Sequence, residues 1–224
     1  MLIGAIGKQR ERIYMRGYFI TFEGPDGAGK TTQIRLLNDY LKAKGWDTVL
    51  TREPGGTPIG EKIRNIILDV ENREMNPIAE MLLYAASRAQ HVSQLIKPAL
   101  EQGKIVLCDR FVDSSIAYQG FGRDLGIDMV EGVNHFALQG IIPDLTLLFA
   151  IDPEKGLERS RQRRKAMDRL EKEQLDFHKK VYEGFMALSR KYPQRFRVID
   201  ASLEIENIHK IVVDEIQQLL RRAK

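Results

Sequence analysis

The sequence predicts an α/β protein whose core is a five-stranded parallel sheet flanked by helices on both faces. Two observations predict it: short apolar runs rich in β-branched and aromatic residues recur along the chain, and segments with helical periodicity separate them. Strands that alternate with helices pair in parallel, because each helical crossover returns the chain to the same end of the sheet. The expected strands are 18–22, 48–51, 104–108, 145–151 and 196–199.

Length and composition indicate one domain. The 224 residues, 43% of them hydrophobic, suffice for a full core, and we expect this domain over 15–224. Residues 1–14 precede the first strand and Met15 could serve as a start, so we expect them to be a dispensable N-terminal extension. The single cysteine, Cys108, excludes a disulfide framework and favours the reducing cytoplasm. No run approaches the roughly 20 apolar residues of a membrane helix, so no membrane partner is expected.

The helical segments follow in order. After the first strand, Ile34, Leu37 and Leu41 share one helix face. The longest helix is expected between the second and third strands, where apolar residues keep a 3.6-residue spacing over 78–96. A neighbouring face of that helix carries Met81, Tyr84, Arg88 and His91. The last helix, over 205–219, is amphipathic and is expected to be structural.

A glycine-rich loop follows the first strand directly and opens the first helix. The loop consists of Gly24, Pro25, Asp26, Gly27, Ala28, Gly29, Lys30 and Thr31, and Thr32 completes the set of expected ATP-binding residues. In this G-x-x-x-x-G-K-T pattern, backbone N–H groups surround phosphate oxygens, Lys30 reaches the β- and γ-phosphates, and the Thr31 hydroxyl can ligate Mg²⁺. The strand before the loop and the helix after it argue against an incidental glycine turn. The sequence therefore predicts a nucleoside triphosphate site with Mg²⁺.

Charged residues follow the third strand at the same edge of the sheet, where open parallel sheets bind their ligands. The strand closes on Asp109, whose carboxylate is expected to meet Mg²⁺ directly or through water, although such a residue can also simply cap a helix. The next residue, Arg110, could bridge the phosphates of a donor and an acceptor nucleotide. Together with Lys30, these two residues are the first catalytic candidates.

Two further positions suggest a second ligand. Arg52 ends the second strand before a Pro-Gly-Gly turn and could clamp a monophosphate, or form a surface salt bridge to Glu53 or Glu61. Tyr84 and Arg88 lie one helical turn apart and could stack on and hydrogen-bond a flat base. On physical grounds alone, a half-buried aromatic ring beside an exposed arginine is the more common outcome for such a pair.

A run of basic residues spans 159–165, with five of seven positions basic. It is either a solvated helix face or a helical lid, expected over about 153–170, that lowers arginines onto the triphosphate and excludes water. The phosphate loop itself supplies only Lys30, so the lid is the best source of a transition-state arginine. The candidates are Arg161, Arg163 and Arg164.

Taken together, four motifs resemble the bacterial thymidylate kinase family. They are FEGPDGAGKTT at 22–32, REPGGT at 52–57, DRF at 109–111 and SSIAYQG at 114–120. The resemblance runs from about Met15 to the C-terminus. It implies a P-loop nucleoside-monophosphate-kinase fold with a helical lid, transfer of the γ-phosphoryl group of ATP to dTMP to give dTDP and ADP for dTTP synthesis, Mg²⁺ as cofactor, and a homodimer.

The same resemblance implies how the phosphate and sugar of dTMP are held. Asp26 would meet the deoxyribose 3′-hydroxyl, and Arg52 and Arg110 would hold the dTMP phosphate. Tyr118 would lie under the sugar and crowd a 2′-hydroxyl, which favours deoxyribose. The chain resembles the bacterial subtype whose phosphate loop lacks an arginine, as at Gly27, and whose lid supplies one; the doubled Arg163-Arg164 leaves the acting arginine open between these two and Arg161.

The resemblance also implies how the base is recognised. Tyr84 would stack on thymine, at a position where many members carry Phe, so that its hydroxyl needs a partner. Arg88 and Ser115 would address the base edge, and Gln119 belongs to the same substrate-binding set.

Three other functions fit parts of the pattern. A kinase for another monophosphate, such as dUMP, or for a nucleoside shares most of these features, and one missing methyl group is worth only about 1–3 kcal/mol. A nucleotide switch or ATPase module that acts on a protein partner would leave Arg52 and Arg110 with no second substrate to hold, and the guanine-selecting Asn-Lys-x-Asp motif is missing. The net charge of +4 could suggest nucleic-acid binding, but the basic residues cluster without interleaved aromatics.

Overall fold

A computed structural model of the protein describes residues 17–163 and 168–222. Its centre is a five-stranded sheet in the order β2-β3-β1-β4-β5, with every neighbouring pair parallel. The strands are β1 (Phe19–Glu23), β2 (Thr48–Arg52), β3 (Ile105–Asp109), β4 (Leu145–Ala150) and β5 (Phe196–Asp200). The predicted parallel sheet is confirmed, with the strand bounds within one residue of expectation. The extension expected over 1–14 lies outside the described residues.

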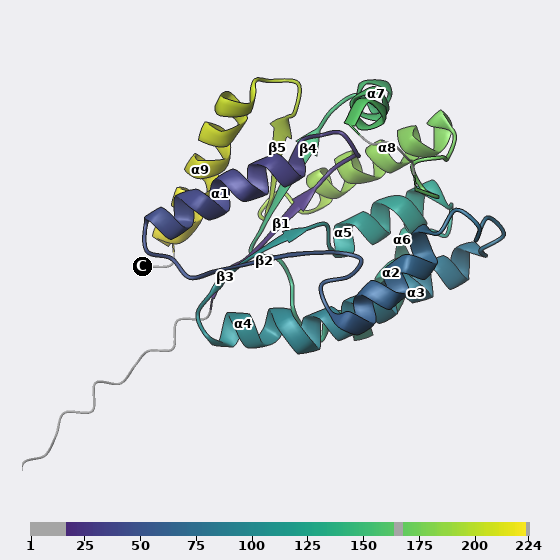
Figure 1. The fold of residues 1–224 in the computed structure, drawn as a ribbon, viewed down its shortest axis with the longest axis horizontal. Coiled ribbons are helices and arrows are strands. Elements are labelled where there is room, and N and C mark those ends of the chain that lie inside the picture. Colours follow the sequence, from purple (N-terminus) through teal and green to yellow (C-terminus); the bar gives the residue numbers. More distant parts are fainter. Residues whose placement is uncertain (1–16, 164–167, 223–224) are drawn as a thin grey trace, which may run out of the picture.

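Helices cover both faces of this sheet (Figure 1). They are α1 (Lys30–Ala43), α2 (Pro58–Leu68), α3 (Pro77–His91), α4 (Lys97–Glu101), α5 (Val112–Ser115), α6 (Ile127–Leu138), α7 (Pro153–Arg163), α8 (Leu175–Lys191) and α9 (Ile205–Arg222), with π-helical segments η1 (Val92–Ile96) and η2 (Ile116–Gly122). None of the helices in these described ranges combines the length and apolar character needed to cross a membrane.

Two apolar cores separate the sheet from its helices. On one face, α1 and α9 pack through residues such as Leu37 and Val212, as their periodicity predicted. On the other face, α3, η1, α4, η2 and α8 bury a larger cluster that includes Phe19, Phe111 and Phe185. The sheet edge at the carboxyl ends of the strands stays open between these layers.

The long helix between β2 and β3 differs from the expectation in two respects. It passes through the π-helical turn η1 before Pro98, whose ring cannot donate the N–H that a regular helix requires. Moreover, Ile78 and Leu82 of its apolar stripe are 47% and 51% exposed, whereas Arg88 and His91 of the neighbouring face are fully buried. The polar side chains can face inward because each finds a charged or hydrogen-bonding partner there.

Candidate active site

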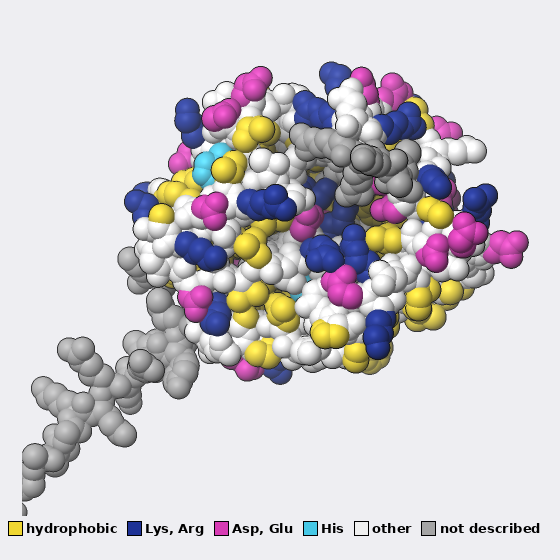
Figure 2. Space-filling view, in the orientation of Figure 1, with side chains coloured by type: hydrophobic (Ala, Val, Ile, Leu, Met, Phe, Trp, Pro, Cys, Tyr) yellow, Lys and Arg dark blue, Asp and Glu magenta, His cyan; other side chains and the backbone are white. Residues whose placement is uncertain are grey.

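A cavity of about 650 Å³ lies at the carboxyl ends of β1, β2 and β3. Figure 2 shows the hollow in the middle of one face of the molecule, with Lys and Arg side chains gathered around it. Residues from every predicted motif except the lid arginines line it: Asp26, Gly27, Gly29, Lys30, Thr31, Thr32, Arg52, Tyr84, Arg88, Asp109, Arg110, Ser115, Tyr118 and Gln119. The fold thus brings the predicted donor and acceptor residues around one cavity.

The phosphate loop leads from β1 into α1, which begins at Lys30 after Gly29 in the left-handed conformation. Only glycine adopts this backbone readily, and it turns the N–H groups of the helix start toward the cavity. The Lys30 ammonium is buried and donates to the carbonyls of Gly24, at 2.9 Å, and Pro25, at 2.8 Å. Burial lowers the pKa of Lys30 to about 8. The Lys30 ammonium therefore contacts the backbone of the phosphate loop, next to the place where phosphates would bind.

Two oxygen ligands suited to Mg²⁺ meet beside the loop. The Thr31 hydroxyl donates to Oδ2 of Asp109 over 3.1 Å, which places a hydroxyl and a carboxylate side by side. Hard oxygen donors of this kind, few in number and completed by phosphates and water, are typical of nucleotide-bound Mg²⁺. No group of three or more His, Cys, Asp or Glu side chains suited to a metal occurs in the described part of the chain. The residues present therefore fit a metal that arrives with the nucleotide.

Arg110 follows β3 in a left-handed conformation with φ 67° that few non-glycine residues adopt. Its guanidinium donates to Oδ1 of Asp26 at 3.0 Å and to the Ser114 hydroxyl at 3.2 Å. It also lies over the ring of Tyr118, with 5.1 Å between the guanidinium carbon and the ring centroid. Three of the four residues predicted to meet the sugar and phosphate of the acceptor, Asp26, Arg110 and Tyr118, thus touch one another.

Glu23, at the end of β1, holds the chain that carries Arg110. This fully buried carboxylate accepts from the backbone N–H of Phe111 at 2.7 Å and lies 2.5 Å from the Ser114 hydroxyl. Burial, together with the neighbouring Asp113, raises the pKa of Glu23 to about 8. Sequence reasoning did not identify Glu23; the available signal was an acidic residue closing an otherwise apolar strand.

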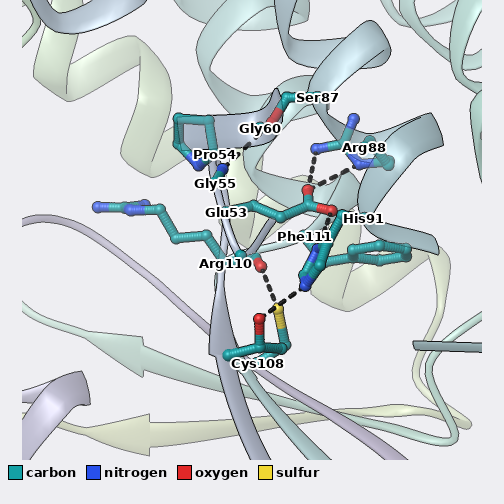
Figure 3. A network of polar contacts seen from close by, with 12 residues as sticks. Glu53, Pro54, Gly55, Gly60, Ser87, Arg88, His91, Cys108, Arg110 and Phe111 are labelled. Carbon is teal, nitrogen blue, oxygen red and sulfur yellow. Dashed lines mark hydrogen bonds and ion pairs between the residues drawn. The ribbon is translucent and has the colours of Figure 1, made fainter. Parts of the chain in front are cut away.

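Arg88 is 1% exposed and lies in a buried network (Figure 3). Its Nη2 and Nε lie 2.7 and 2.9 Å from Oε2 of Glu53, and its Nη1 donates to the Ser115 hydroxyl at 3.0 Å and to Oδ1 of Asn134. On the other side of Glu53, Nδ1 of His91 lies 3.0 Å from Oε1. Sequence reasoning treated Glu53 only as a surface partner of Arg52, whereas it anchors Arg88.

Arg52 and Tyr84 also line the cavity. Arg52 is half exposed, and its Nη2 lies 2.8 Å from Oε2 of Glu61, so the structure has the surface ion pair that was the alternative to a phosphate clamp. Tyr84 is partly buried, and burial raises the pKa of its hydroxyl. Neither arrangement prevents these side chains from meeting a ligand, because both line the cavity.

The lid region begins with α7, which lies against the phosphate loop. A Cβ atom added to Gly27 would lie 2.1 Å from the carbonyl oxygen of Gly156 on α7. Arg159 donates to the carbonyl of Ala201 at 2.8 Å, and Arg161 is exposed. Arg163 is the last residue of α7, and Arg164 lies outside the described residues.

The comparisons with known proteins agree with this geometry. Residues 22–212 match the family model of thymidylate kinase. The chain belongs to the thymidylate kinase family. The thymidylate kinase of Thermoanaerobacter sp. (strain X514) is 52% identical over 206 residues, which are 92% of this chain and 100% of the relative. That of Lactobacillus acidophilus is 53% identical over 211 residues, covering 93% and 98%.

A solved structure supports the fold of this family member. The crystal structure of thymidylate kinase from Ehrlichia chaffeensis superposes with a TM-score of 0.74 at 35% identity, covering 90% of this chain and 99% of that one. The predicted family and P-loop nucleoside-monophosphate-kinase fold are confirmed.

The remaining substrate candidate, Gln119, lines the cavity and is fully buried. Its Nε2 donates to Oε1 of Glu80 at 2.9 Å, whereas its Oε1 has no hydrogen-bond partner within 17–163 and 168–222. A buried acceptor without a protein partner is rare, so a ligand or a water molecule supplies the donor to this oxygen.

Proposed function

We propose that this member of the thymidylate kinase family transfers the γ-phosphoryl group of ATP to dTMP, giving ADP and dTDP for dTTP synthesis. The observation that carries this proposal is the single cavity in which a phosphate loop faces a second set of charged and aromatic side chains. A nucleotide switch or ATPase module needs no such acceptor site. The names of the relatives point the same way.

At the ATP end, the backbone N–H groups of 24–32 and the Lys30 ammonium would bind the phosphates. Thr31 and Asp109 would hold Mg²⁺, which when bound neutralises charge on the phosphates. Lys30 would exchange its two loop carbonyls for phosphate oxygens. Because phosphoryl transfer requires little proton chemistry, these residues act mainly by positioning and by stabilising charge.

At the acceptor end, Arg110 would turn from Asp26 to the dTMP phosphate and bridge it to the transferring group. Its release would leave Asp26 to accept from the 3′-hydroxyl of the deoxyribose. Arg52 would leave Glu61 in the same way, which costs little because that ion pair is exposed. Tyr118 would limit the space at the 2′ position of the sugar.

The base would stack on Tyr84 and be read along its edge. Thymine presents an N–H donor at N3 and an acceptor at O4. The unpartnered Oε1 of Gln119 would accept from N3–H, and Arg88 with Ser115 would donate to O4. The lid would complete the site, with Arg161, Arg163 or Arg164 supplying a cation to the transferring phosphoryl group.

The test is a coupled ADP-release assay with ATP and Mg²⁺, offering dTMP, dUMP, dCMP, dGMP and UMP separately at equal concentration. The proposal expects strong turnover with dTMP, weak turnover with dUMP and little with the others. The weak use of dUMP follows because a methyl group contributes only about 1–3 kcal/mol to discrimination. ATP hydrolysis that no monophosphate stimulates would instead assign the protein to the switch or ATPase class.

We further propose that the protein acts as a cytoplasmic homodimer. Three adjoining helices, α2, α3 and α6, carry large apolar side chains that are about half exposed or more. They are Ile59, Ile66, Ile78, Leu82, Met129 and Phe136. Large apolar side chains exposed on neighbouring helices are typical of a subunit interface. Analytical ultracentrifugation should give twice the chain mass, and a Leu82→Glu variant should shift toward the monomer; a monomeric parent protein would refute the proposal.

A further inference from the structure

Glu80, on α3, is a fully buried carboxylate where three segments of the chain meet behind the cavity. It accepts from Nε2 of Gln119 at 2.9 Å and from Nη2 of Arg169 at 2.6 Å. Arg123 adds two contacts, through Nη2 at 3.1 Å and Nε at 3.3 Å. Gln119 alone among these partners lines the cavity. Among the hydrogen-bond partners of Glu80, Gln119 is therefore the one that links it to the proposed base site.

The carboxylate is ionised and so can only accept hydrogen bonds. Burial by itself would raise the pKa of Glu80, but the hydrogen bonds and charge of Arg123, with those of Gln119 and Arg169, lower the pKa below its usual value. The guanidinium groups of Arg123 and Arg169 can only donate hydrogen bonds, so Glu80 acts as the acceptor in both ion pairs.

An acceptor-only partner dictates which way the Gln119 amide points. The NH₂ group must face Glu80, because a reversed amide would set two acceptor oxygens 2.9 Å apart in a buried place and lose a charge-assisted hydrogen bond. A ligand in the cavity consequently meets Gln119 through Oε1, the atom that has no partner in the described residues. With one N–H of the amide held by Glu80, the atom of Gln119 that still lacks a partner and meets the ligand is an acceptor.

We infer that Glu80 is a positioning residue that sets the base specificity of the site by holding the Gln119 amide with its oxygen toward the ligand. Thymine and uracil, which carry a donor at N3, are accepted, and cytosine, whose N3 is an acceptor, is rejected. This inference rests on the proposed function, because it assumes that the cavity binds a pyrimidine monophosphate.

The test is the variant Glu80→Gln, which keeps the shape of the side chain but offers both a donor and an acceptor, so that the Gln119 amide can reverse. The ratio of kcat/KM for dTMP to kcat/KM for dCMP should fall at least tenfold. The ratio for dTMP to dUMP should not change, because both bases carry the N3 donor. A merely structural role would lower all three values together, and an unchanged ratio of dTMP to dCMP would overturn the inference.

Three further variants keep the experiment decisive. Glu173→Gln removes the other carboxylate that pairs with Arg123, at 2.7 Å, without touching Gln119, and should leave the dTMP to dCMP ratio as in the parent protein. If Glu80→Gln does not fold, Glu80→Gln combined with Arg169→Met removes the guanidinium that would be left unpaired, and Arg169→Met alone is its control. The double variant should lose discrimination and the control should keep it; equal ratios would refute the inference.

Measurements on the parent protein distinguish a failure of the proposed function from a failure of the inference about Glu80. Failure to phosphorylate dTMP would refute the proposed function, whatever the variants do. A parent protein that phosphorylates dTMP and dCMP equally well would leave the kinase function standing and overturn the role of Glu80.

Discussion

Neutralising Glu53 is the sharpest test of the buried network that holds Arg88. The side chains of Arg88 and Glu53 are 1% and 3% exposed, and their charged atoms approach to 2.7 Å. Glu53→Gln keeps the volume and removes only the charge, so a guanidinium without a counter-ion stays in the core. Removing one partner of such a pair costs about 3–5 kcal/mol. For a domain of this size, the melting temperature should fall by about 6–20 °C.

The neighbouring His91 limits how far the structure can compensate. In the parent protein, Nδ1–H of His91 donates to Glu53 and Nε2 accepts from the Thr51 hydroxyl, at 3.0 and 2.7 Å. With Gln at position 53, the imidazole can change tautomer and accept from the new amide, so hydrogen bonds around His91 are kept. The lost stability therefore reports the charge of Glu53 rather than its hydrogen bonds.

The assay is thermal and urea unfolding of the parent protein and the variant, without nucleotide. Lys180→Met is the matched control, because Lys180 pairs with Asp124 at 2.6 Å but both side chains are about half exposed or more. Exposed pairs contribute about 0–1 kcal/mol. If Glu53→Gln destabilises the protein no more than Lys180→Met does, burial does not make the charge of Glu53 more important for stability than that of an exposed residue.

Three further predictions concern the site. Arg110→Ala should lower kcat/KM for dTMP by about 10²–10³-fold while circular dichroism stays unchanged; a folded variant with full activity would remove the bridging role. Lys30→Ala should retain dTMP binding in calorimetry but lose ATP-dependent turnover, and unchanged kinetics would contradict the phosphate-loop assignment. Glu23, with a pKa raised from 4.5 to about 8, contributes stability that is complete below the lower value and is lost as pH rises through the higher one. The unfolding free energy of Glu23→Gln should therefore fall less between about pH 5 and 8, by up to about 1.4 kcal/mol per pH unit, and equal slopes would disprove this.

The sheet and the phosphate loop could be predicted because their signals are local. A strand such as β3 is four apolar residues in a row closed by Asp109, and the glycines, Lys30 and Thr31 of the phosphate loop lie within a segment of eight residues, 24–31. The lining of the cavity by Arg52, Asp109 and Arg110 followed from a general rule, since ligands of open parallel sheets bind at the carboxyl ends of the strands.

The supporting carboxylates could not be predicted, because their roles depend on distant partners. Glu23 binds the backbone of a residue 88 positions away, and Glu80 pairs with Arg169, 89 positions away. On sequence grounds, Arg88 was half of a helical pair facing a base, and nothing in its spacing identified Glu53 as its anchor. Helical spacing identifies neighbours on one element, whereas the fold decides which element lies opposite.

The contact between Gly27 and Gly156 restricts how this enzyme can evolve. An arginine in the phosphate loop at position 27 would collide with the backbone of α7 before its guanidinium reached any phosphate. An arginine at position 27 fits only after α7 has shifted, so the two changes are epistatic and their order matters. The proposed source of the transition-state cation, the lid, is therefore tied to the position of a helix and cannot be exchanged for a loop arginine by one substitution.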